Sequence, residues 1–317
     1  MTITQLKYVL AVAEYQNFTI ASEKCFVTQP TLSMQIQKLE EELNVIIFNR
    51  KKKPIELTPI GDKIIHQAKV IVDESNRISD IVDQQKGFIG GEFKLGIIPT
   101  VMPTLLPLFL KTFINKYSKV NLIIEELTTD EMVKKLIEGH LDAGIAATPL
   151  EHNAIKERVL YYEPFVGFVN ENHRLYAENK LFVEDLNIDD ILLLEDGHCF
   201  RDIILNLCGS FKKELPNHFK LESGSFNTLI KLSKEGLGMT LLPYLQTLDL
   251  NEIDKKYLRN FENPVPSREV SLIYHKSQLK IQLIEALKNT IDATIRGIIS
   301  FNDVKIISPL QKTKKEP

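Results

Sequence analysis

The sequence predicts an α/β protein with a separate helical domain at its N-terminus, and three observations carry this prediction. Apolar residues recur with the 3.6-residue period of short helices over residues 1–58, and one long helical pattern fills residues 59–89. Residues 90–303 then alternate apolar strand patterns with helical ones. Because such alternation is typical of a parallel α/β sheet, we expect a larger second domain there, followed by a polar tail at residues 304–317.

The composition fits a folded protein that stays in the cytoplasm. Of the 317 residues, 44% are hydrophobic and 26% are charged, and the net charge of −3 means that a nucleic-acid site must be a local cationic patch. No apolar run approaches the roughly 18 residues of a membrane span, and the N-terminus has no signal-peptide pattern. Three cysteines are too few for a secreted disulfide framework, so any disulfide is expected to be transient and redox-active.

Three short helices are expected in the first domain. Thr2 and Gln5 have the form of a capping box at the start of the first, and a second is predicted over residues 20–24. Thr28 can cap the third, with Pro30 in its first turn, where proline is tolerated. The apolar residues of this third helix are spaced for one buried stripe: Leu32, Ile36, Leu39 and Leu43.

This order of elements is a helix-turn-helix pattern with a polar outward face on the third helix. Glutamine, serine and threonine can hydrogen-bond to base edges in the DNA major groove, and lysine can meet phosphate. The candidate DNA contacts on this face are Thr28, Gln29, Pro30, Thr31, Ser33, Gln35 and Lys38. By periodicity alone, a three-helix bundle with a solvated face fits equally well.

A cationic run follows the third helix and precedes a short extended segment at residues 55–57. It consists of the four adjacent residues Arg50, Lys51, Lys52 and Lys53. Cations before a small β-ribbon resemble a wing that grips the DNA backbone, although such runs are also common on solvated surfaces.

Thr58 and Pro59 are typical of the cap and first position of the long helix. Its apolar and small residues alternate spacings of four and three, which is a heptad seam: Ile64, Ala68, Ile71, Ser75, Ile78 and Val82. A single helix of about 30 residues is poorly stable alone, so we expect the seam to pair with a second copy of the chain. The alternative is packing against the C-terminal domain.

The second domain is expected to contain two subdomains joined by two crossovers. Subdomain I covers residues 90–161 and 268–303, and subdomain II covers residues 162–267. In such sheets, ligand contacts come from loops at the carboxyl ends of strands. Thr100 and Thr129 follow predicted strands in this way, although a structural role is the alternative for both.

Two of the three cysteines flank a short amphipathic helix predicted over residues 200–208. A helix start and neighbouring cations lower a thiol pKa, and Cys199 has His198 and Arg201 beside it. A thiolate can attack the O–O bond of a peroxide to give a sulfenic acid, which a second thiol converts to a disulfide. Cys208 is the nearby second thiol. The alternative, that the cysteines fill apolar gaps, suits Cys208 better than Cys199, and it is the reading we favour for Cys25 in the first domain.

The spacing of this pair has a consequence for any disulfide between them. Nine residues of helix rise by roughly 13 Å, whereas disulfide-bonded Cα atoms lie within roughly 7 Å. The helix would therefore have to unfold before Cys199 and Cys208 could be joined, and oxidation would be a conformational switch.

Residues 18–43, which include Gln-Pro-Thr-Leu-Ser at residues 29–33, resemble the winged helix-turn-helix of LysR-type transcriptional regulators. Leu-Thr-Pro-Ile-Gly at residues 57–61 resembles the motif that closes this domain, while Met34 stands where many members carry arginine. The resemblance implies DNA binding at paired half-sites, dimerisation through the long helix, commonly as a dimer of dimers, and a periplasmic-binding-protein-like regulatory domain.

Residues 195–202 together with Cys208 resemble the redox segment of the peroxide-sensing members of that family, with Phe200 in place of a common leucine. The resemblance implies that Cys199 is the peroxidatic cysteine and Cys208 the resolving one. It also implies polar groups that position peroxide, namely Thr100, Thr129 and His198. Arg268 is a further candidate, beside Arg201, for stabilising the thiolate.

These observations favour a homo-oligomeric, peroxide-sensing transcriptional regulator. Its expected partners are double-stranded DNA, hydrogen peroxide, further copies of itself, RNA polymerase and a cellular disulfide reductant. No Walker motif, dinucleotide fingerprint or His/Cys metal cluster occurs in the sequence, so no cofactor or metal is expected. One alternative is a LysR-type regulator that binds a small metabolite between the subdomains. Another is a thiol peroxidase, but a DNA-binding domain argues against an enzyme.

Overall fold

The structure, a computed structural model, describes residues 1–85, 89–209, 223–299 and 304–310. The chain forms two compact units, Met1–Phe88 (the first unit) and Ile89–Pro317 (the second unit). None of the described helices is long and apolar enough to span a lipid bilayer.

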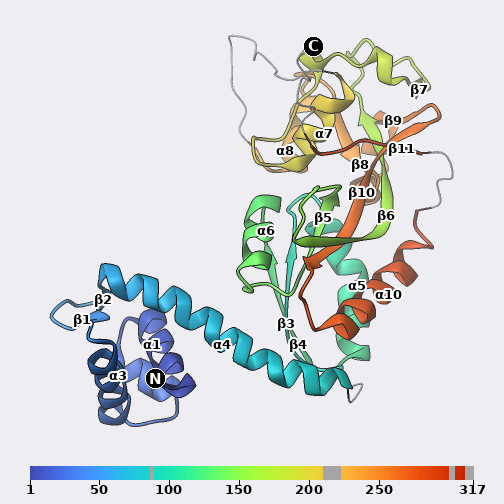
Figure 1. Cartoon of the computed structure of the whole chain (residues 1–317). Helices are drawn as coiled ribbons and strands as arrows, with labels where there is room; N and C mark the ends of the chain where they lie inside the picture. The colour runs from blue at the N-terminus through green and yellow to red at the C-terminus, as the bar shows by residue number, and fades with distance from the viewer. Residues whose placement is uncertain (86–88, 210–222, 300–303, 311–317) are drawn as a thin grey trace, which may run out of the picture. The chain divides into compact units, whose positions relative to one another are not determined.

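The first unit contains three short helices, a two-stranded antiparallel ribbon and a long helix (Figure 1). These elements are α1 (Ile3–Tyr15), α2 (Phe18–Lys24), α3 (Gln29–Leu43), β1 (Phe48–Asn49), β2 (Glu56–Leu57) and α4 (Pro59–Gln85). The predicted capping box of Thr2 and Gln5 is confirmed at the start of α1. Thr28 precedes α3, but its side chain makes no capping bond, because its hydroxyl pairs with that of Thr31 at 2.8 Å.

The predicted buried stripe of α3 is confirmed for three of its four residues. Leu32, Ile36 and Leu39 are fully buried in the core of the first unit, whereas Leu43 is 38% exposed. The prediction for Leu43 is wrong because α3 ends there. Asn44 follows in the left-handed conformation (φ 52°) and turns the chain away, so this side chain stays partly exposed.

The long helix α4 uses part of its heptad seam within its own unit. The Thr58 hydroxyl accepts a bond from the Gly61 N–H at 2.9 Å and so caps the helix start, as predicted. Ala68 is buried in the same core as α1, and Ile64 and Ile71 pack against it. This part of the seam therefore contacts the helical domain, which the sequence did not indicate. Ile78, further along, is 66% exposed, and the Val82 side chain lies outside the described residues.

The second unit is a mixed α/β domain. Its strands are β3 (Gly91–Ile97), β4 (Val120–Glu126), β5 (Ala143–Thr148), β6 (Ile155–Phe168), β7 (Lys180–Leu181), β8 (Thr240–Pro243), β9 (Leu258–Phe261), β10 (Val265–His275) and β11 (Val304–Ile306). Its helices are α5 (Met102–Lys116), α6 (Thr129–Ile137), α7 (Cys199–Leu207), α8 (Phe226–Lys234), α9 (Tyr244–Leu248) and α10 (Ile281–Ile295), with short 3-10 turns at Val183–Asp185, Ile188–Asp190 and Asp254–Tyr257.

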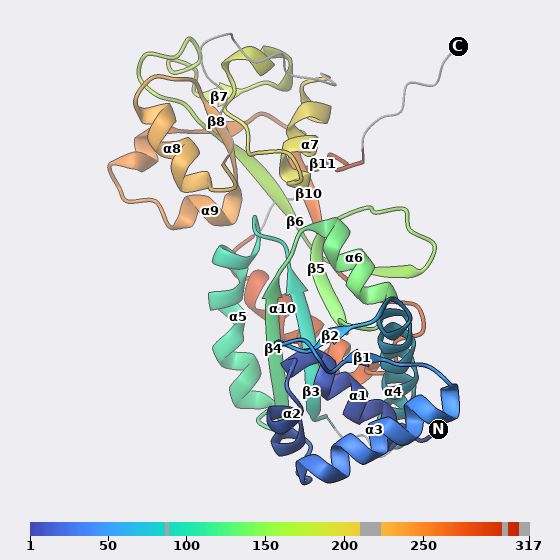
Figure 2. The ribbon, with the colours of Figure 1, turned by 90° about the vertical axis from the view of Figure 1, so that its left-hand side faces the viewer.

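The sheet of the second unit is mixed rather than parallel. The described strands follow the order β4-β3-β5-β10-β6-β9-β7, with β8 on β6 and β11 on β10. Strand β3 is parallel to β4 and β5, as predicted, but β10 is antiparallel to β5 and β6. The two long strands β6 and β10 run side by side from the part of the unit that holds α5 and α10 to the part that holds α7 and α8 (Figure 2). They cross both predicted subdomain boundaries, which therefore stay a prediction.

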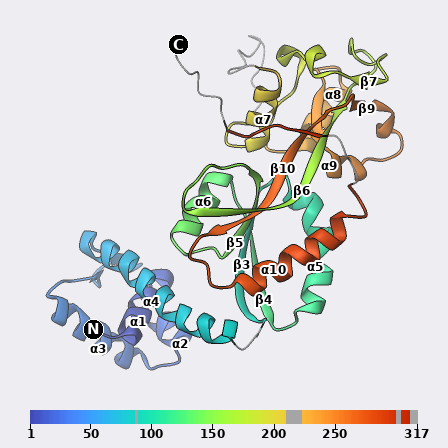
Figure 3. The same ribbon diagram turned by 45° about the vertical axis from the view of Figure 1, so that its right-hand side comes forward.

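Helices cover both faces of the sheet. Helices α5 and α10 pack together on one face, and α6 lies on the other (Figure 3). The apolar run of residues 191–194 is typical of a strand, but it makes a single parallel bridge, between Ile191 and Met239.

The tail expected from residue 304 begins as ordered structure. Strand β11 pairs in parallel with residues 265–267 of β10, and Ile307 beyond it is buried. The apolar residues Val304, Ile306 and Ile307 allow this pairing, which a polar tail would not make. The last residues, 311–317, lie outside the described part of the chain.

Candidate redox site

Helix α7 carries the two cysteines of interest at its ends. Cys199 is its first residue and Cys208 is its C-cap. The apolar spacing that predicted the helix is confirmed, because Phe200, Ile203 and Ile204 are all buried. Phe200 anchors the start of the helix through edge-to-face contacts with two other phenylalanine rings, at 5.4 and 5.0 Å between centroids.

Both thiols are free, and the helix between them is intact. The rise of roughly 13 Å over this interval keeps the two Cα atoms beyond disulfide distance. The structure is thus that of the reduced chain, and a disulfide between these residues requires α7 to unfold.

The environment of Cys199 keeps its thiol protonated at rest. Burial raises the pKa of Cys199, while the positive charge of Arg268 and a hydrogen bond with the Thr129 hydroxyl lower it. The Asp202 carboxylate raises the pKa further, and the Phe200 N–H at the helix start lowers it. The net pKa is raised, so the expectation of a lowered value is wrong, because desolvation outweighs the nearby cation and the helix start.

Arg268 is the cation at this site, and it is held in a fully buried ion pair. Its Nε and Nη2 donate to Glu163 Oε2 at 2.9 and 2.7 Å, and its Nη1 and Nη2 donate to the Thr100 hydroxyl and carbonyl at 2.9 and 3.0 Å. The other carboxylate oxygen of Glu163 accepts the Leu245 N–H at 3.0 Å. The guanidinium also stacks 5.4 Å from the Phe200 ring.

Glu163 is a site residue that the sequence did not reveal. It occupies β6 opposite Arg268 of β10 in the antiparallel register, and both side chains have 1% exposure or less. A charged residue beside an apolar run was the only available signal. Its partner lies 105 positions away, so the pair emerges only when the strands are aligned.

Thr100 and Thr129 both lie at the carboxyl ends of strands, as predicted, and both face this site. Thr100 is buried, and its hydroxyl accepts a hydrogen bond from Arg268. Apart from its interaction with the Cys199 thiol, the Thr129 hydroxyl is buried without a hydrogen-bond partner among the described residues. Thr128 and Glu131 form a capping box at the start of α6, so Thr129 itself is not needed as the cap.

His198 and Arg201 adjoin Cys199 in sequence, but the contacts that the structure gives for their side chains are with other residues. The His198 ring lies 3.5 Å from the Glu195 carboxylate. The Arg201 guanidinium donates to the Leu194 carbonyl at 3.0 Å and pairs with Asp196 at 2.7 Å. On a helix, a residue two positions on points about 200° away. Adjacency in sequence therefore does not bring these side chains to the sulfur.

Cys208 lies in an environment that disfavours its thiolate. Burial, followed by the negative charge of Asp190, raises its pKa to about 11. The Asp190 carboxylate is itself bound by Arg174 at 3.0 Å and lies 3.2 Å from His173. Cys25, at the end of α2, is half-buried, and burial raises its pKa too, in line with a packing role.

The raised pKa of Cys208 predicts a distinct pH dependence in the reduced protein. Iodoacetamide labelling of Cys208, followed by peptide mapping, should stay slow through pH 9 and rise as the pH approaches 11. The folded state favours the protonated thiol, so the stability that this thiol contributes is lost as the pH rises through the same range. In the chain unfolded by urea, the labelling inflection should fall to the ordinary thiol range. Equal inflections in both states would contradict the burial of this thiol.

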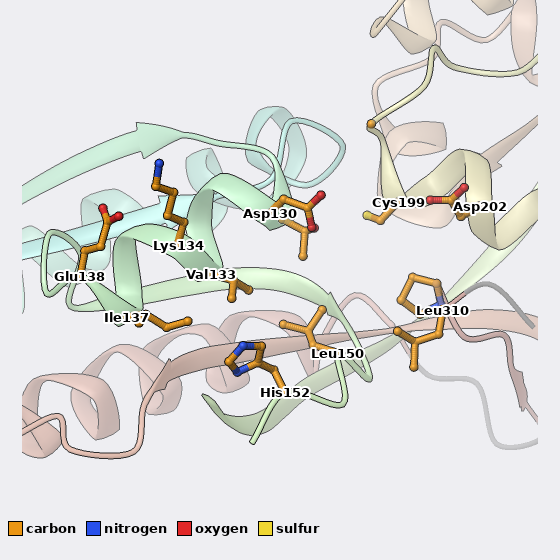
Figure 4. A pocket seen from close by; sticks show the side chains of 13 residues that line it. Asp130, Val133, Lys134, Ile137, Glu138, Leu150, His152, Cys199, Asp202 and Leu310 are labelled. Atoms are coloured by element: carbon orange, nitrogen blue, oxygen red, sulfur yellow. The ribbon is translucent and has the colours of Figure 1, made fainter. Parts of the chain in front are cut away.

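An open pocket of about 520 Å³ adjoins Cys199 (Figure 4). Helix α6 forms one wall, and Leu150 and His152 from the loop after β5 lie opposite. Pro309 and Leu310 close the end near the thiol. Asn206 of α7 holds this last segment by donating to the Ser308 and Leu310 carbonyls at 2.9 and 2.8 Å. No group of three or more potential metal ligands occurs in the described part of the chain.

The first unit places most of the predicted DNA-contacting residues on its surface. The exposed ones are Thr28, Gln29, Pro30, Thr31, Lys38, Arg50, Lys51, Lys52 and Lys53. Ser33 and Gln35 are half-buried, and Gln35 accepts a bond from Gln5 at 3.3 Å.

Arg50 is tied into the domain rather than projecting from it. Its guanidinium pairs with Glu40 at 2.7 Å, donates to the Ser33 hydroxyl at 3.2 Å and lies 5.1 Å from the Phe18 ring. The Glu40 carboxylate also accepts the backbone N–H groups of Ile47 and Phe48 at the start of the ribbon. These bonds fix the ribbon to α3, so Arg50 has a structural task beside any contact with phosphate.

Comparison with known proteins identifies both units. The model described as "Bacterial regulatory helix-turn-helix protein, lysR family" matches residues 3–62, and "LysR substrate binding domain" matches residues 86–295. The hydrogen peroxide-inducible genes activator of Pectobacterium carotovorum is 32% identical over 297 residues, which cover 94% of this chain and 98% of that protein.

Solved structures agree with this assignment. Full-length OxyR of Pseudomonas aeruginosa, carrying a cysteine-to-aspartate mutation, superposes with a TM-score of 0.72 at 33% identity, over 93% of this chain and 98% of that one. A cysteine mutant of Corynebacterium glutamicum OxyR with hydrogen peroxide bound gives a TM-score of 0.62 at 28% identity, over 96% and 98% of the two chains. The chain therefore belongs to the LysR family of bacterial helix-turn-helix regulators, and within that family it is similar to OxyR.

Proposed function

We propose that the chain is a DNA-binding transcriptional regulator that senses hydrogen peroxide through Cys199. The observation that carries the proposal is the position of this thiol. It lies at the start of α7, close enough to the buried Arg268 to be affected by its positive charge, and it bonds with the Thr129 hydroxyl. Relatives named as hydrogen peroxide-inducible gene activators support the same function.

The proposed chemistry has two steps. The Cys199 thiol loses its proton and the thiolate attacks one peroxide oxygen. The O–O bond breaks, and the departing hydroxide takes up the released proton to become water, which leaves a sulfenic acid on Cys199. The Cys208 thiol then attacks that sulfur, a second water leaves, and a disulfide forms. Arg268 offsets part of the cost of the buried thiolate. Among the described residues, the Thr129 hydroxyl has no partner other than the Cys199 thiol, and we propose that it bonds a peroxide oxygen.

Thr100 and His198 take indirect roles in this proposal. Thr100 holds Arg268 through two hydrogen bonds, and His198 precedes the helix as its N-cap. Arg201 fixes the loop before α7 through its bonds to Leu194 and Asp196. Each supports the geometry at Cys199 rather than touching its sulfur.

Disulfide formation is proposed to rebuild the second unit. Unfolding α7 removes buried side chains such as Phe200 and Ile203 from the core, and it frees the C-terminal segment that Asn206 holds. A cellular disulfide reductant restores the helix. The change passes to DNA through an oligomer, proposed as a dimer of dimers in the cytoplasm, in which α3 reads paired half-sites and the altered arrangement acts on RNA polymerase. No cofactor takes part, and the protein is not an enzyme.

A regulator that binds a metabolite between the subdomains is the alternative, and DNase footprinting with a Cys199→Ser variant separates the two. In the wild-type protein, peroxide is expected to change the footprint on an operator, and a reductant should reverse it. Cys199→Ser should bind the same DNA and give one footprint with or without peroxide, whereas Cys25→Ser should behave as wild type. A Cys199→Ser footprint that still shifts with peroxide would overturn the proposal.

A further inference from the structure

We call the pocket beside Cys199 the groove, and a stripe of side chains along α6 lines one of its walls. Thr129, Val133 and Ile137 follow one another at intervals of four residues, so they form one stripe along α6. Thr129 contacts the Cys199 thiol, and Val133 and Ile137 are labelled in Figure 4. Eight residues of helix make this stripe about 12 Å long. Leu150 faces the stripe from the opposite wall, and Leu310 lies near the Cys199 end.

The groove is much larger than hydrogen peroxide requires. One water occupies about 30 Å³ of liquid, so a molecule of two oxygen atoms fills roughly 60 Å³. The groove encloses about 520 Å³. Val133, Ile137 and Leu150 give it an apolar stretch beside the polar side chains of Lys134 and His152, and an apolar chain would gain free energy by leaving water along that stretch.

The polar groups of the groove define the kind of molecule that fits. At one end are the Cys199 thiol and the buried Thr129 hydroxyl, which pair with an O–O–H group. The carboxylates of Asp130 and Asp202 flank this end and disfavour an anionic head group. Between the two ends, the apolar side chains of Val133, Ile137 and Leu150 lie beside Lys134 and His152, and Glu138 lines the far end. The complementary ligand has an uncharged peroxide head and an unbranched apolar tail.

We propose that organic hydroperoxides with an alkyl chain are a second class of oxidant for Cys199, held by the groove along α6. This proposal rests on the proposed function, because it uses the same thiolate. The thiolate attacks the terminal oxygen of ROOH, the O–O bond breaks, and the alkoxide takes a proton and leaves as the alcohol ROH. The sulfur is oxidised to the sulfenic acid and the hydroperoxide is reduced.

The test measures oxidation of Cys199 in the reduced, full-length protein by hydrogen peroxide and by methyl, butyl and octyl hydroperoxide. Differential alkylation and peptide mapping give the rate constant for each oxidant, and the rate of a free thiol in solution corrects for intrinsic reactivity. The corrected rate should rise with chain length, by up to about fourfold for each methylene group that the groove buries. Hydrogen peroxide gives the reference rate that the chain does not affect.

Two variants locate the effect. Ile137 in the groove and Ile114 on α5 outside it are 47% and 45% exposed, so Ile137→Asp and Ile114→Asp are a matched pair. Ile137→Asp should lower the octyl hydroperoxide rate by roughly tenfold or more while the hydrogen peroxide rate stays within about twofold. Ile114→Asp should change neither rate. Val133→Phe, which fills the middle of the groove, should remove the dependence on chain length.

The outcomes separate this proposal from the proposed function. If hydrogen peroxide fails to oxidise Cys199, the sensing mechanism itself is wrong. If hydrogen peroxide oxidises Cys199 but octyl hydroperoxide reacts no faster than methyl hydroperoxide, only the groove proposal is overturned. Equal effects of Ile137→Asp and Ile114→Asp would overturn it as well.

Discussion

Replacement of Glu163 by glutamine is expected to destabilise the second unit by about 3–5 kcal/mol, because it leaves a buried charge unpaired. One carboxylate oxygen of Glu163 accepts two bonds from Arg268, and the other accepts the Leu245 N–H. A glutamine has a single acceptor oxygen, so its NH₂ group must face one of these donors. Either Arg268 or the backbone of α9 then loses its partner in a site without solvent.

Denaturant unfolding of the full chain, followed by circular dichroism, measures this loss. Glu262→Gln provides the matched control, because Glu262 pairs with Lys180 at 2.8 Å while the two side chains are 37% and 55% exposed. Exposed pairs of this kind contribute about 0–1 kcal/mol. Equal effects of the two substitutions would show that the Arg268 pair is not the buried anchor that the structure describes.

Replacement of Cys208 by serine is expected to uncouple oxidation from the conformational change. Peroxide should still convert Cys199 to a sulfenic acid. Because no disulfide with residue 208 can form, α7 is expected to stay folded. In the wild-type protein, oxidation should increase hydrogen exchange at the α7 amides by at least roughly tenfold, because an unfolded segment loses the protection of its helical bonds. In Cys208→Ser, the α7 amides should keep the protection of the reduced state.

A dimedone-type trap for the sulfenic acid and hydrogen exchange on the same sample check this prediction. Cys25→Ser is the control, since Cys25 belongs to the other unit and should leave both readouts at wild-type values. Loss of α7 protection in oxidised Cys208→Ser would mean that sulfenic acid formation alone opens the helix.

Local patterns in the sequence were sufficient to predict helices in both units. The capping box of Thr2 and Gln5 and the apolar spacing from Phe200 to Leu207 depend on residues one or two turns apart, and both are confirmed. Leu43 shows the limit of such patterns, because periodicity does not tell where a neighbouring surface ends.

Local patterns could not predict features that depend on contacts between residues far apart in the sequence. The antiparallel β10 places Arg268 opposite Glu163, and neither the direction of the strand nor the pair follows from local spacing. The same holds for the thiol. The sequence indicated that Cys199 starts a helix and has charged neighbours. The depth of its burial, which has the largest effect on its pKa, depends on the assembled fold. Arg201 was a candidate cation for the Cys199 thiolate because it is adjacent in sequence. In the structure it pairs with Asp196, and Arg268 is the cation near the thiol.

The most direct test of the switch is peptide mapping of the protein without reduction, before and after a brief exposure to peroxide. The helix that separates Cys199 from Cys208 in the reduced chain must be dismantled for these residues to meet. The mechanism predicts that peroxide yields a peptide in which Cys199 is joined to Cys208, and that a reductant removes it. Recovery of both cysteines in separate peptides, with Cys199 oxidised, would contradict it.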